Sequence, residues 1–394
     1  MAARINSMSI RRVNRVRVFH ALREHPCISQ TELQRVTGLD KATTSMVVAQ
    51  LLDEGLLERG EPASVDRRVG RPETALSISP AAGVLVGARL EPRKIRLITT
   101  DLAGSPLQRL EVPGSTNLKE AVALFHQGLA RILQDTGPEL MVRGIGVGIP
   151  GLMDRAGCLM LAPNLGWSGP IQPLLQEGLD APLYLDNDAN AAAIAERLFG
   201  ACRGCENFVY LSCHSGIGGG LFLEGRLYRG AHGFSGEIGH VTVVPGGRPC
   251  GCGKRGCLET YASEAGILRT LAERGLGFED LVGVAQAAAR QDPVVLAVLD
   301  EVGQALGMAL SSLVNILNPE MMVLGGTLAN VFDYLKDGLH RTLEANVMAT
   351  HRAGLRVILS PLGSEVVPMG GIALAMDGFL SAPRLDVSLR PTSA

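Results

Sequence analysis

Residues 239–259 place one histidine and three cysteines at the spacing His240-x9-Cys250-x-Cys252-x4-Cys257. Four such side chains can close a tetrahedral site around one zinc ion, and a site without an open position is structural. Gly251, Gly253 and Gly256 would allow so short a loop to fold back around the ion. A redox-active cysteine loop is the alternative interpretation.

Residues 1–80 predict a winged helix-turn-helix. Apolar residues at helical spacing indicate a first helix over residues 14–24. Ser29 followed by Glu32 is a capping box that opens a second helix, which Gly38 ends, and Asp40 can cap a third helix over about residues 41–54. Residues 56–59 and 74–78 then alternate as two strands around an arginine-rich loop, which makes a wing.

The charge of this region favours an anionic partner. It holds 12 Lys and Arg against 9 Asp and Glu, although the whole chain has a net charge of -2. We expect the third helix to enter the major groove of DNA and the loop arginines to lie near phosphates or the narrower groove. A small helical protein-interaction domain with a solvated loop is the alternative. The candidate DNA-binding residues are Lys41, Thr43, Thr44, Ser45, Arg67, Arg68 and Arg71.

From residue 81 onward the pattern changes to alternating strands and helices, which indicates an α/β protein of two mixed-sheet lobes with a ligand cleft between them. The sequence has no apolar run of about twenty residues, and its basic N-terminal stretch lacks the apolar core of a secretory signal. We therefore expect no membrane insertion and a cytoplasmic location. In that compartment a cysteine cluster more often binds metal than forms disulfides.

Motifs spread from Gly144 to about Gly371 resemble the ROK family, which comprises repressors, open reading frames and sugar kinases. They are GIGVGIPG, APNLGW, DNDANAA, SGIGGG, GEIGH, CGCGKRGCLE and NPEMMVLGG. The resemblance implies an α/β fold in which the winged helix-turn-helix precedes a two-lobed, actin-like (ribonuclease H-like) ROK domain. We expect a DNA-binding domain at residues 1–80, a first lobe at 81–185, a second lobe with the zinc site at 186–375, and a tail at 376–394 that packs on the first lobe.

The resemblance also implies a sugar site beside the metal. In the family, the zinc ligands match His240, Cys250, Cys252 and Cys257, and the second ring nitrogen of the histidine reaches a sugar hydroxyl. Metal ligation would fix the ring and its tautomer. The expected sugar-binding residues are Asn187, Asp188, Glu237, His240, Glu259 and Asn164, with Gly151 as a further weak candidate.

The retained Asp188 matches the residue that takes the proton from the attacking hydroxyl in sugar kinases of this family. Those kinases carry an Asp-x-Gly-x-Thr phosphate loop, and the corresponding residues here are Arg89, Glu91 and Arg93. Arg89 cannot coordinate magnesium, Glu91 adds a negative charge, and Pro92 removes a backbone N–H donor. We therefore expect a protein that is not an enzyme, and keep an ATP-dependent sugar kinase with an appended DNA-binding domain as the alternative.

These expectations combine into one function. The chain is predicted to be a sugar-responsive DNA-binding regulator, and more specifically a repressor of genes for carbohydrate uptake or metabolism. Its predicted partners are double-stranded operator DNA, a sugar or sugar-phosphate effector, and further copies of the chain in a homodimer or homotetramer. Control by a partner protein in place of a sugar is a third possibility.

Overall fold

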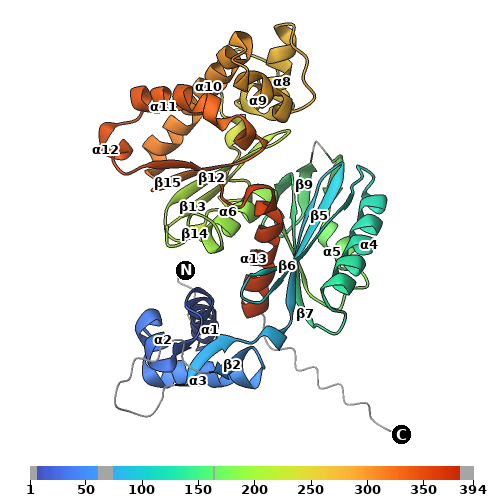
Figure 1. Cartoon of the computed structure of the whole chain (residues 1–394), viewed down its shortest axis with the longest axis vertical. Helices are drawn as coiled ribbons and strands as arrows, with labels where there is room; N and C mark the ends of the chain where they lie inside the picture. The colour runs from blue at the N-terminus through green and yellow to red at the C-terminus, as the bar shows by residue number, and fades with distance from the viewer. Residues whose placement is uncertain (1–6, 61–73, 163–164, 382–394) are drawn as a thin grey trace.

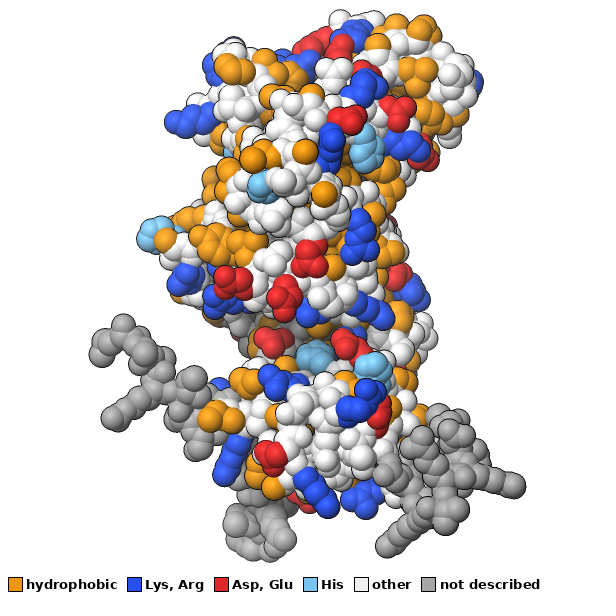
Figure 2. All heavy atoms as spheres, turned by 90° about the vertical axis from the view of Figure 1, so that its left-hand side faces the viewer, with side chains coloured by type: hydrophobic (Ala, Val, Ile, Leu, Met, Phe, Trp, Pro, Cys, Tyr) orange, Lys and Arg blue, Asp and Glu red, His pale blue; other side chains and the backbone are white. Residues whose placement is uncertain are grey.

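Three bodies follow one another along the long axis of the molecule (Figure 1). The computed structural model describes residues 7–60, 74–162 and 165–381. The winged domain lies at one end, the first lobe follows it, and the second lobe lies at the far end. Charged side chains and histidines gather around the narrow waist between the winged domain and the rest of the molecule (Figure 2).

The winged domain has the predicted order of helices and strands, although its first helix begins at Ser7 and not at residue 14. Its helices are α1 (Ser7–Glu24), α2 (Gln30–Thr37) and α3 (Lys41–Asp53). The Ser29 side chain accepts a hydrogen bond from the Glu32 N–H, and the Asp40 side chain accepts one from the Thr43 N–H, so both predicted caps are present. The strands are β1 (Ile28–Ser29), β2 (Leu57–Gly60) and β3 (Ala75–Ile78), in the order β1-β3-β2. The short β1 adds a third strand to the predicted pair.

The first lobe contains a five-stranded sheet in the order β11-β7-β4-β5-β6. Alternate residues of a strand face opposite sides of a sheet, and both sides of β4 are buried. Val86, Ala88 and Leu90 pack toward α4 (Leu118–Thr136), whereas Leu85 packs toward α13 (Val366–Ser381). The strands are β4 (Val84–Leu90), β5 (Lys94–Asp101), β6 (Pro106–Pro113), β7 (Val142–Ile149) and β11 (Leu183–Asn187). A small antiparallel sheet of β8 (Leu152–Met153), β9 (Leu159–Ala162) and β10 (Trp167–Gly169) leads into α5 (Ile171–Gln176).

The second lobe contains a five-stranded sheet in the order β14-β13-β12-β15-β16. One face packs against α6 (Asp188–Leu198), and the other packs against a helical layer that includes α10 (Pro293–Leu317) and α11 (Phe332–Asn346). The strands are β12 (Phe208–Cys213), β13 (Ile217–Leu223), β14 (Arg226–Leu227), β15 (Met321–Gly326) and β16 (Arg356–Leu359). The remaining helices are α7 (Glu259–Ala262), α8 (Glu264–Glu273), α9 (Leu281–Ala289) and α12 (Ala349–Arg352).

Helix α10 is the one described helix that is long and apolar enough to cross a membrane. Its most apolar stretch is 56% buried inside the protein, and the helix packs along α11. This burial is typical of a core helix.

Helix α13 lies between the two lobes, against the first-lobe strands β4, β7 and β11 on one side and α6 on the other (Figure 1). The contact with β7 is backbone to backbone, because a Cβ at Gly146 would lie 1.9 Å from the Gly371 carbonyl oxygen. Two of the predicted domain limits fall inside secondary-structure elements. The limit at 375/376 cuts through α13, which packs on the first lobe from residue 366, and the limit at 185/186 cuts through β11.

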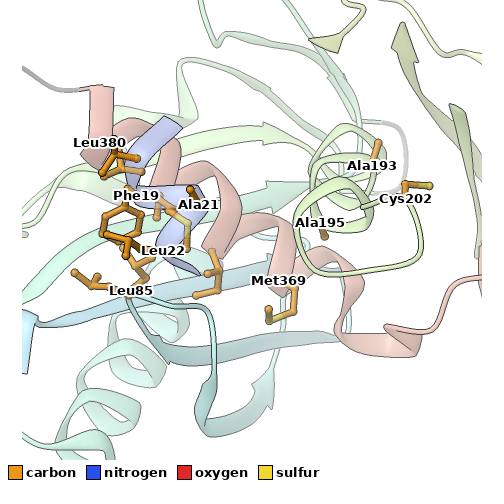
Figure 3. Packing of buried hydrophobic residues seen from close by; sticks show 14 of the residues in the cluster. Phe19, Ala21, Leu22, Leu85, Ala193, Ala195, Cys202, Met369 and Leu380 are labelled. Atoms are coloured by element: carbon orange, nitrogen blue, oxygen red, sulfur yellow. The ribbon is translucent and has the colours of Figure 1, made fainter. Parts of the chain in front are cut away.

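The winged domain and the first lobe share one continuous hydrophobic core. Phe19 and Leu22 of α1 are fully buried and lie beside Leu85 of β4 and Leu380 of α13 (Figure 3). Burial of such side chains removes apolar area from water, at about 25 cal/mol per Å². The winged domain is therefore docked on the body through the same helix that separates the lobes.

Candidate functional site

The predicted metal ligands come together in one cluster. A short 3-10 helix (Ile238–His240) carries His240, and a tight loop pinned by bridges between Thr242 and Cys257 and between Pro249 and Arg255 carries the cysteines. The ligand atoms of His240, Cys250, Cys252 and Cys257 all lie within 4.8 Å of one another. The loop therefore brings one imidazole nitrogen and three sulfurs to a common point.

The separations within the cluster fit a single tetrahedral ion. Cys252 Sγ lies 3.7 Å from Cys257 Sγ, and Cys250 Sγ lies 3.6 Å from His240 Nδ1. Ligands at about 2.3 Å (sulfur) and about 2.0–2.1 Å (nitrogen) from one ion, at tetrahedral angles, are about 3.6–3.8 Å apart. These two of the six ligand–ligand distances therefore match those around a tetrahedral ion, and the cluster could hold a metal.

The two ring nitrogens of His240 face different partners. Nδ1 faces the cysteine cluster, whereas Nε2 lies 3.8 Å from Glu237 Oε2. Burial, together with the negative charges of Glu259 and Asp188, raises the pKa of Glu237. Glu237 is therefore close enough to two other predicted sugar-site carboxylates to feel their charge.

Glu259 begins helix α7, two residues after Cys257, so the metal loop controls where its carboxylate lies. Its Oε2 accepts a hydrogen bond of 3.0 Å from the Ile217 N–H. The backbone N–H of Leu258 donates to Val241 O, which ties α7 to the segment that carries His240. The loop that surrounds the candidate metal site thus also fixes two polar groups of the candidate sugar site.

Asn187 has a capping role that the sequence did not reveal. Its Oδ1 accepts hydrogen bonds from the backbone N–H groups of Ala189 and Asn190 at the start of α6, and its Nδ2 donates to Gly151 O at 2.8 Å. Asn187 therefore holds both the N-terminus of α6, which presents Asp188, and the loop that contains Gly151. The predicted contact residue Asn164 lies outside the described residues.

Arg89 crosses from the first lobe to the second. Its Nη2 donates to Asp188 Oδ2 at 3.1 Å, and its Nη1 lies 3.0 Å from His214 Nε2. Glu91 Oε1 is 3.4 Å from Nη1, so Glu91 joins this cluster, whereas Arg93 is exposed. Burial and the positive charge of Arg89 lower the pKa of His214 well below its usual value, which leaves the ring neutral.

Sequence reasoning missed His214, although it directly precedes the predicted glycine-rich turn at 215–220. One signal in the sequence could have identified His214. It places an imidazole directly before a glycine-rich turn of the kind that approaches a phosphate. Arg89 lies near the end of β4 and His214 directly follows β12, so their contact joins the ends of these two strands.

The sequence profile of the ROK family matches residues 83–377. The chain belongs to the ROK family. A MarR family profile matches residues 12–68, within the winged domain.

The chain is similar both to a repressor and to a sugar kinase of the ROK family. The xylose repressor of Bacillus subtilis is 30% identical over 94% of this chain and 97% of its own length. A glucokinase of Halalkalibacterium halodurans is 33% identical over 73% of this chain and 93% of its own length. The crystal structure of a ROK family transcriptional regulator, a homologue of the Escherichia coli MLC protein, covers 94% of this chain and 97% of its own, with a TM-score of 0.82 and 25% identity. The repressor and the regulator structure match the winged domain as well as the ROK domain, whereas the glucokinase match covers less of the chain.

The MarR-like domain presents only part of the predicted DNA-binding set. Lys41 and Ser45 are exposed on α3, and the hydroxyl of Thr43 is 2.6 Å from Asp40 Oδ2 at the cap. Thr44 is fully buried and donates its hydroxyl hydrogen to Asp40 O, so the prediction that it faces DNA is wrong. The three arginines predicted for the wing, Arg67, Arg68 and Arg71, lie outside the described residues.

Cys202 and Cys205 are buried in the core beneath the second-lobe sheet. Cys202 Sγ lies 3.7 Å from Met321 Sδ, and burial raises the pKa of the Cys202 thiol far above its usual value. This pair packs as small hydrophobic side chains.

Proposed function

We propose that the chain is a sugar-responsive DNA-binding transcription regulator that represses genes for carbohydrate uptake or metabolism in the cytoplasm. The observation that carries the proposal is the continuous core from α1 of the winged domain to α13, the helix that also separates the two ROK lobes. A ligand that changes the relation between the lobes therefore acts on the support of the DNA-binding domain. It does so only if it binds the two arrangements with different affinity.

The metal held by His240, Cys250, Cys252 and Cys257 is zinc in this proposal. Three thiolates and one imidazole in a closed tetrahedral arrangement are the ligands and geometry that zinc prefers, and no position remains for substrate. The ion supplies a fixed support for the loop. His240, restrained through Nδ1, then presents Nε2 toward Glu237 as an oriented group for a sugar hydroxyl.

The effector is a sugar or sugar phosphate bound by Asp188, Glu237, His240 and Glu259, with Asn187 and Asn164 as further contacts. Carboxylates and an imidazole suit a polyol, since each hydroxyl both donates and accepts hydrogen bonds. In addition to burial, the charges of Glu259 and Asp188 raise the pKa of Glu237, which supports a common site for these three carboxylates.

The Arg89 cluster supports a regulator over a kinase. A general base must be within reach of the hydroxyl proton it removes, whereas the Asp188 carboxylate is hydrogen-bonded to Arg89. A guanidinium also stands where the kinase loop of the family has a carboxylate for metal. The retained Asp188 keeps an ATP-dependent sugar kinase as the second candidate.

DNA binding involves α3 and the wing of each copy in a homodimer or homotetramer. Dimeric operators place half-sites about one helical turn or a multiple apart, so a small rotation of the winged domains weakens binding. Lys41, Thr43 and Ser45 on α3 and Arg67, Arg68 and Arg71 on the wing are the proposed contacts.

Fluorescence anisotropy tests the proposal. The zinc-loaded protein is titrated onto its own upstream DNA at fixed salt, with and without a panel of pentoses, hexoses and hexose phosphates, because phosphate contacts make affinity salt-dependent. A shift of about tenfold by one sugar, which corresponds to about 1.4 kcal/mol of coupling, supports the proposal. Unchanged DNA binding with every sugar would point to control by a partner protein. Sugar-dependent ATP turnover that is lost in Asp188→Asn would support the kinase.

A further inference from the structure

A cavity of about 720 Å³ opens where the winged domain meets the body, away from the residues of the proposed sugar site. We call it the junction pocket. Its walls come from the end of α1, the turn between β5 and β6, the end of α6 with the turn after it, and the segment that leads into α13. Three arginines line it, namely Arg23, Arg197 and Arg203.

The arginines come from both sides of the joint. Arg23 belongs to the winged domain, and its side chain is only 4% exposed. Its Nη1 donates to Leu198 O at the end of α6, at 2.9 Å, and its guanidinium lies over the ring of Phe199, 5.3 Å from the ring centre. Arg23 therefore ties α1 to the α6 end of the body while it lines the pocket.

The positive charge in the pocket is only partly neutralised. Burial lowers the pKa of Arg23, Glu24 opposes this, and the charges of Arg203 and Arg197 lower it further. The two carboxylates on the rim are already engaged, because Glu24 pairs with Arg23 and Glu365 pairs with Arg109. Among the described residues, Nε of Arg197 is buried and has no hydrogen-bond partner. A buried donor without an acceptor is costly, and guanidinium groups with the same charge repel one another.

We propose that the junction pocket binds a phosphate dianion, either inorganic phosphate or the phosphate monoester of a small metabolite. Arginine presents a planar fork of N–H donors that matches phosphate oxygens, and a dianion would offset the clustered positive charge. Phe199, Leu362 and Met369 add an apolar wall that suits the organic part of a monoester. A phosphate held by Arg197 and Arg203 would lie beside Arg23 of α1, whose own nitrogens are already bonded to His20, Leu198 O and Glu24, and would offset the shared positive charge. It therefore favours the docked arrangement of the winged domain.

Isothermal titration calorimetry on the full-length protein tests the inference. Inorganic phosphate and glycerol 3-phosphate are the probes at an ionic strength held constant with chloride, and glycerol is the uncharged control. We expect saturable binding of the probes, weakened at least about tenfold in the double variant Arg197→Gln/Arg203→Gln, since hydrogen bonds to a charged group are lost. A higher affinity for glycerol 3-phosphate than for inorganic phosphate would indicate that the natural ligand is the phosphate monoester of a metabolite. A higher affinity for inorganic phosphate would indicate the free ion.

Three controls keep the result specific. Arg203→Gln alone changes only an exposed side chain, so it should fold and still weaken phosphate binding. Arg226→Gln removes an arginine whose side chain is 79% exposed elsewhere, and it should not change binding. Glu237→Gln in the proposed sugar site should leave phosphate binding intact, so a failure of the sugar proposal and a failure of this one are separable.

Equal phosphate titrations, or none, for the wild type and the folded double variant would overturn the inference. If that double variant also loses affinity for duplex DNA, the arginines are DNA contacts instead.

Discussion

Nη2 of Arg89 on β4 and Oδ2 of Asp188 at the start of α6 are 3.1 Å apart and join the two lobes through a buried ion pair. The exposed fractions of the two side chains are 4% and 12%. Removal of one partner of such a pair leaves the other charge buried and uncompensated. We expect Arg89→Ala to lower the free energy of unfolding by about 3–5 kcal/mol, measured by urea denaturation.

The matched control for this prediction is Arg226→Ala. Arg226 pairs with Glu224, and both side chains are about 80% exposed (79% and 81%), so the pair is screened by water. Its removal should change the urea midpoint little. Equal midpoints for the two variants would mean that the Arg89 pair does not stabilise the joint between the lobes.

Loss of the metal should separate sugar binding from DNA binding. Cys257→Ser removes one of the four ligands, so we expect loss of bound zinc by mass spectrometry and loss of sugar binding by calorimetry, because Glu259 and His240 depend on that loop. DNA binding without sugar should persist, since the winged domain has its own capped helices. Cys158→Ser, which lies outside the cluster, is the control. Unchanged sugar affinity in the zinc-free variant would contradict the link between metal and sugar site.

Neighbouring residues of α3 should behave differently on DNA. Lys41 is exposed, so Lys41→Ala should weaken binding at all sequences and reduce the slope of log affinity against log salt by about 1. Thr44→Val removes a buried hydroxyl that donates to Asp40 O, which should cost about 1 kcal/mol of stability and leave the salt slope unchanged. Anisotropy over a salt series measures both slopes. A reduced slope in Thr44→Val would show that our orientation of α3 is wrong.

The joint between the winged domain and the body should weaken in acid. Burial, with the charges of Arg23 and Arg197, lowers the pKa of His20 from 6.5 to about 4. The pKa of His20 is lower in the folded protein than in the unfolded chain, so between pH 6.5 and about 4 the unfolded chain binds more protons. The contribution of His20 to the free energy of unfolding is therefore full above pH 6.5 and is lost as the pH falls toward 4. Thermal melts from pH 7 to pH 4 should therefore show a steeper decline for the wild type than for His20→Gln. Parallel declines would exclude His20 as the cause.

The glycine contact between β7 and α13 should tolerate no side chain. A Cβ at Gly146 would overlap the Gly371 carbonyl, so Gly146→Ala should destabilise the fold by about 1–3 kcal/mol or more. A Cβ at Gly277 would meet no atom within 4 Å, which makes Gly277→Ala the control. Calorimetric melting temperatures compare the two. A Gly146→Ala protein as stable as the control would mean that α13 can move away from the sheet.

Local signals explain what the sequence predicted well. The caps at Ser29 and Asp40 lie within three residues of the N–H groups that they bind, and the four candidate metal ligands lie within 18 residues of one another along the chain. The burial of Thr44 could also have been predicted, because the apolar residues Val47 and Val48 lie three and four residues after it on the same helical face. The helical period, applied to Thr44, predicts its burial.

Tertiary contacts explain what was missed. Arg89 contacts Asp188, which is 99 positions away in the sequence, and His214, which is 125 positions away. The local periodicity of the sequence cannot predict contacts over such separations. The residues could be singled out individually, but their role as a bridge between lobes could not. The same holds for α13, through which the predicted domain limit at 375/376 passes, because nothing in its local sequence indicates which sheet the helix covers.

Helix α13 follows every other described element along the chain, yet it covers the inner face of the first-lobe sheet and supports α1. During synthesis, the ribosome releases the winged domain and both sheets before this helix. Leu85 and Ile98 of the sheet, and the side of α1 that contacts α13, then lack this cover until residues 366–381 have emerged. The nascent protein thus passes through an extended interval with an incomplete core, in which it is vulnerable to aggregation and suited to capture by chaperones.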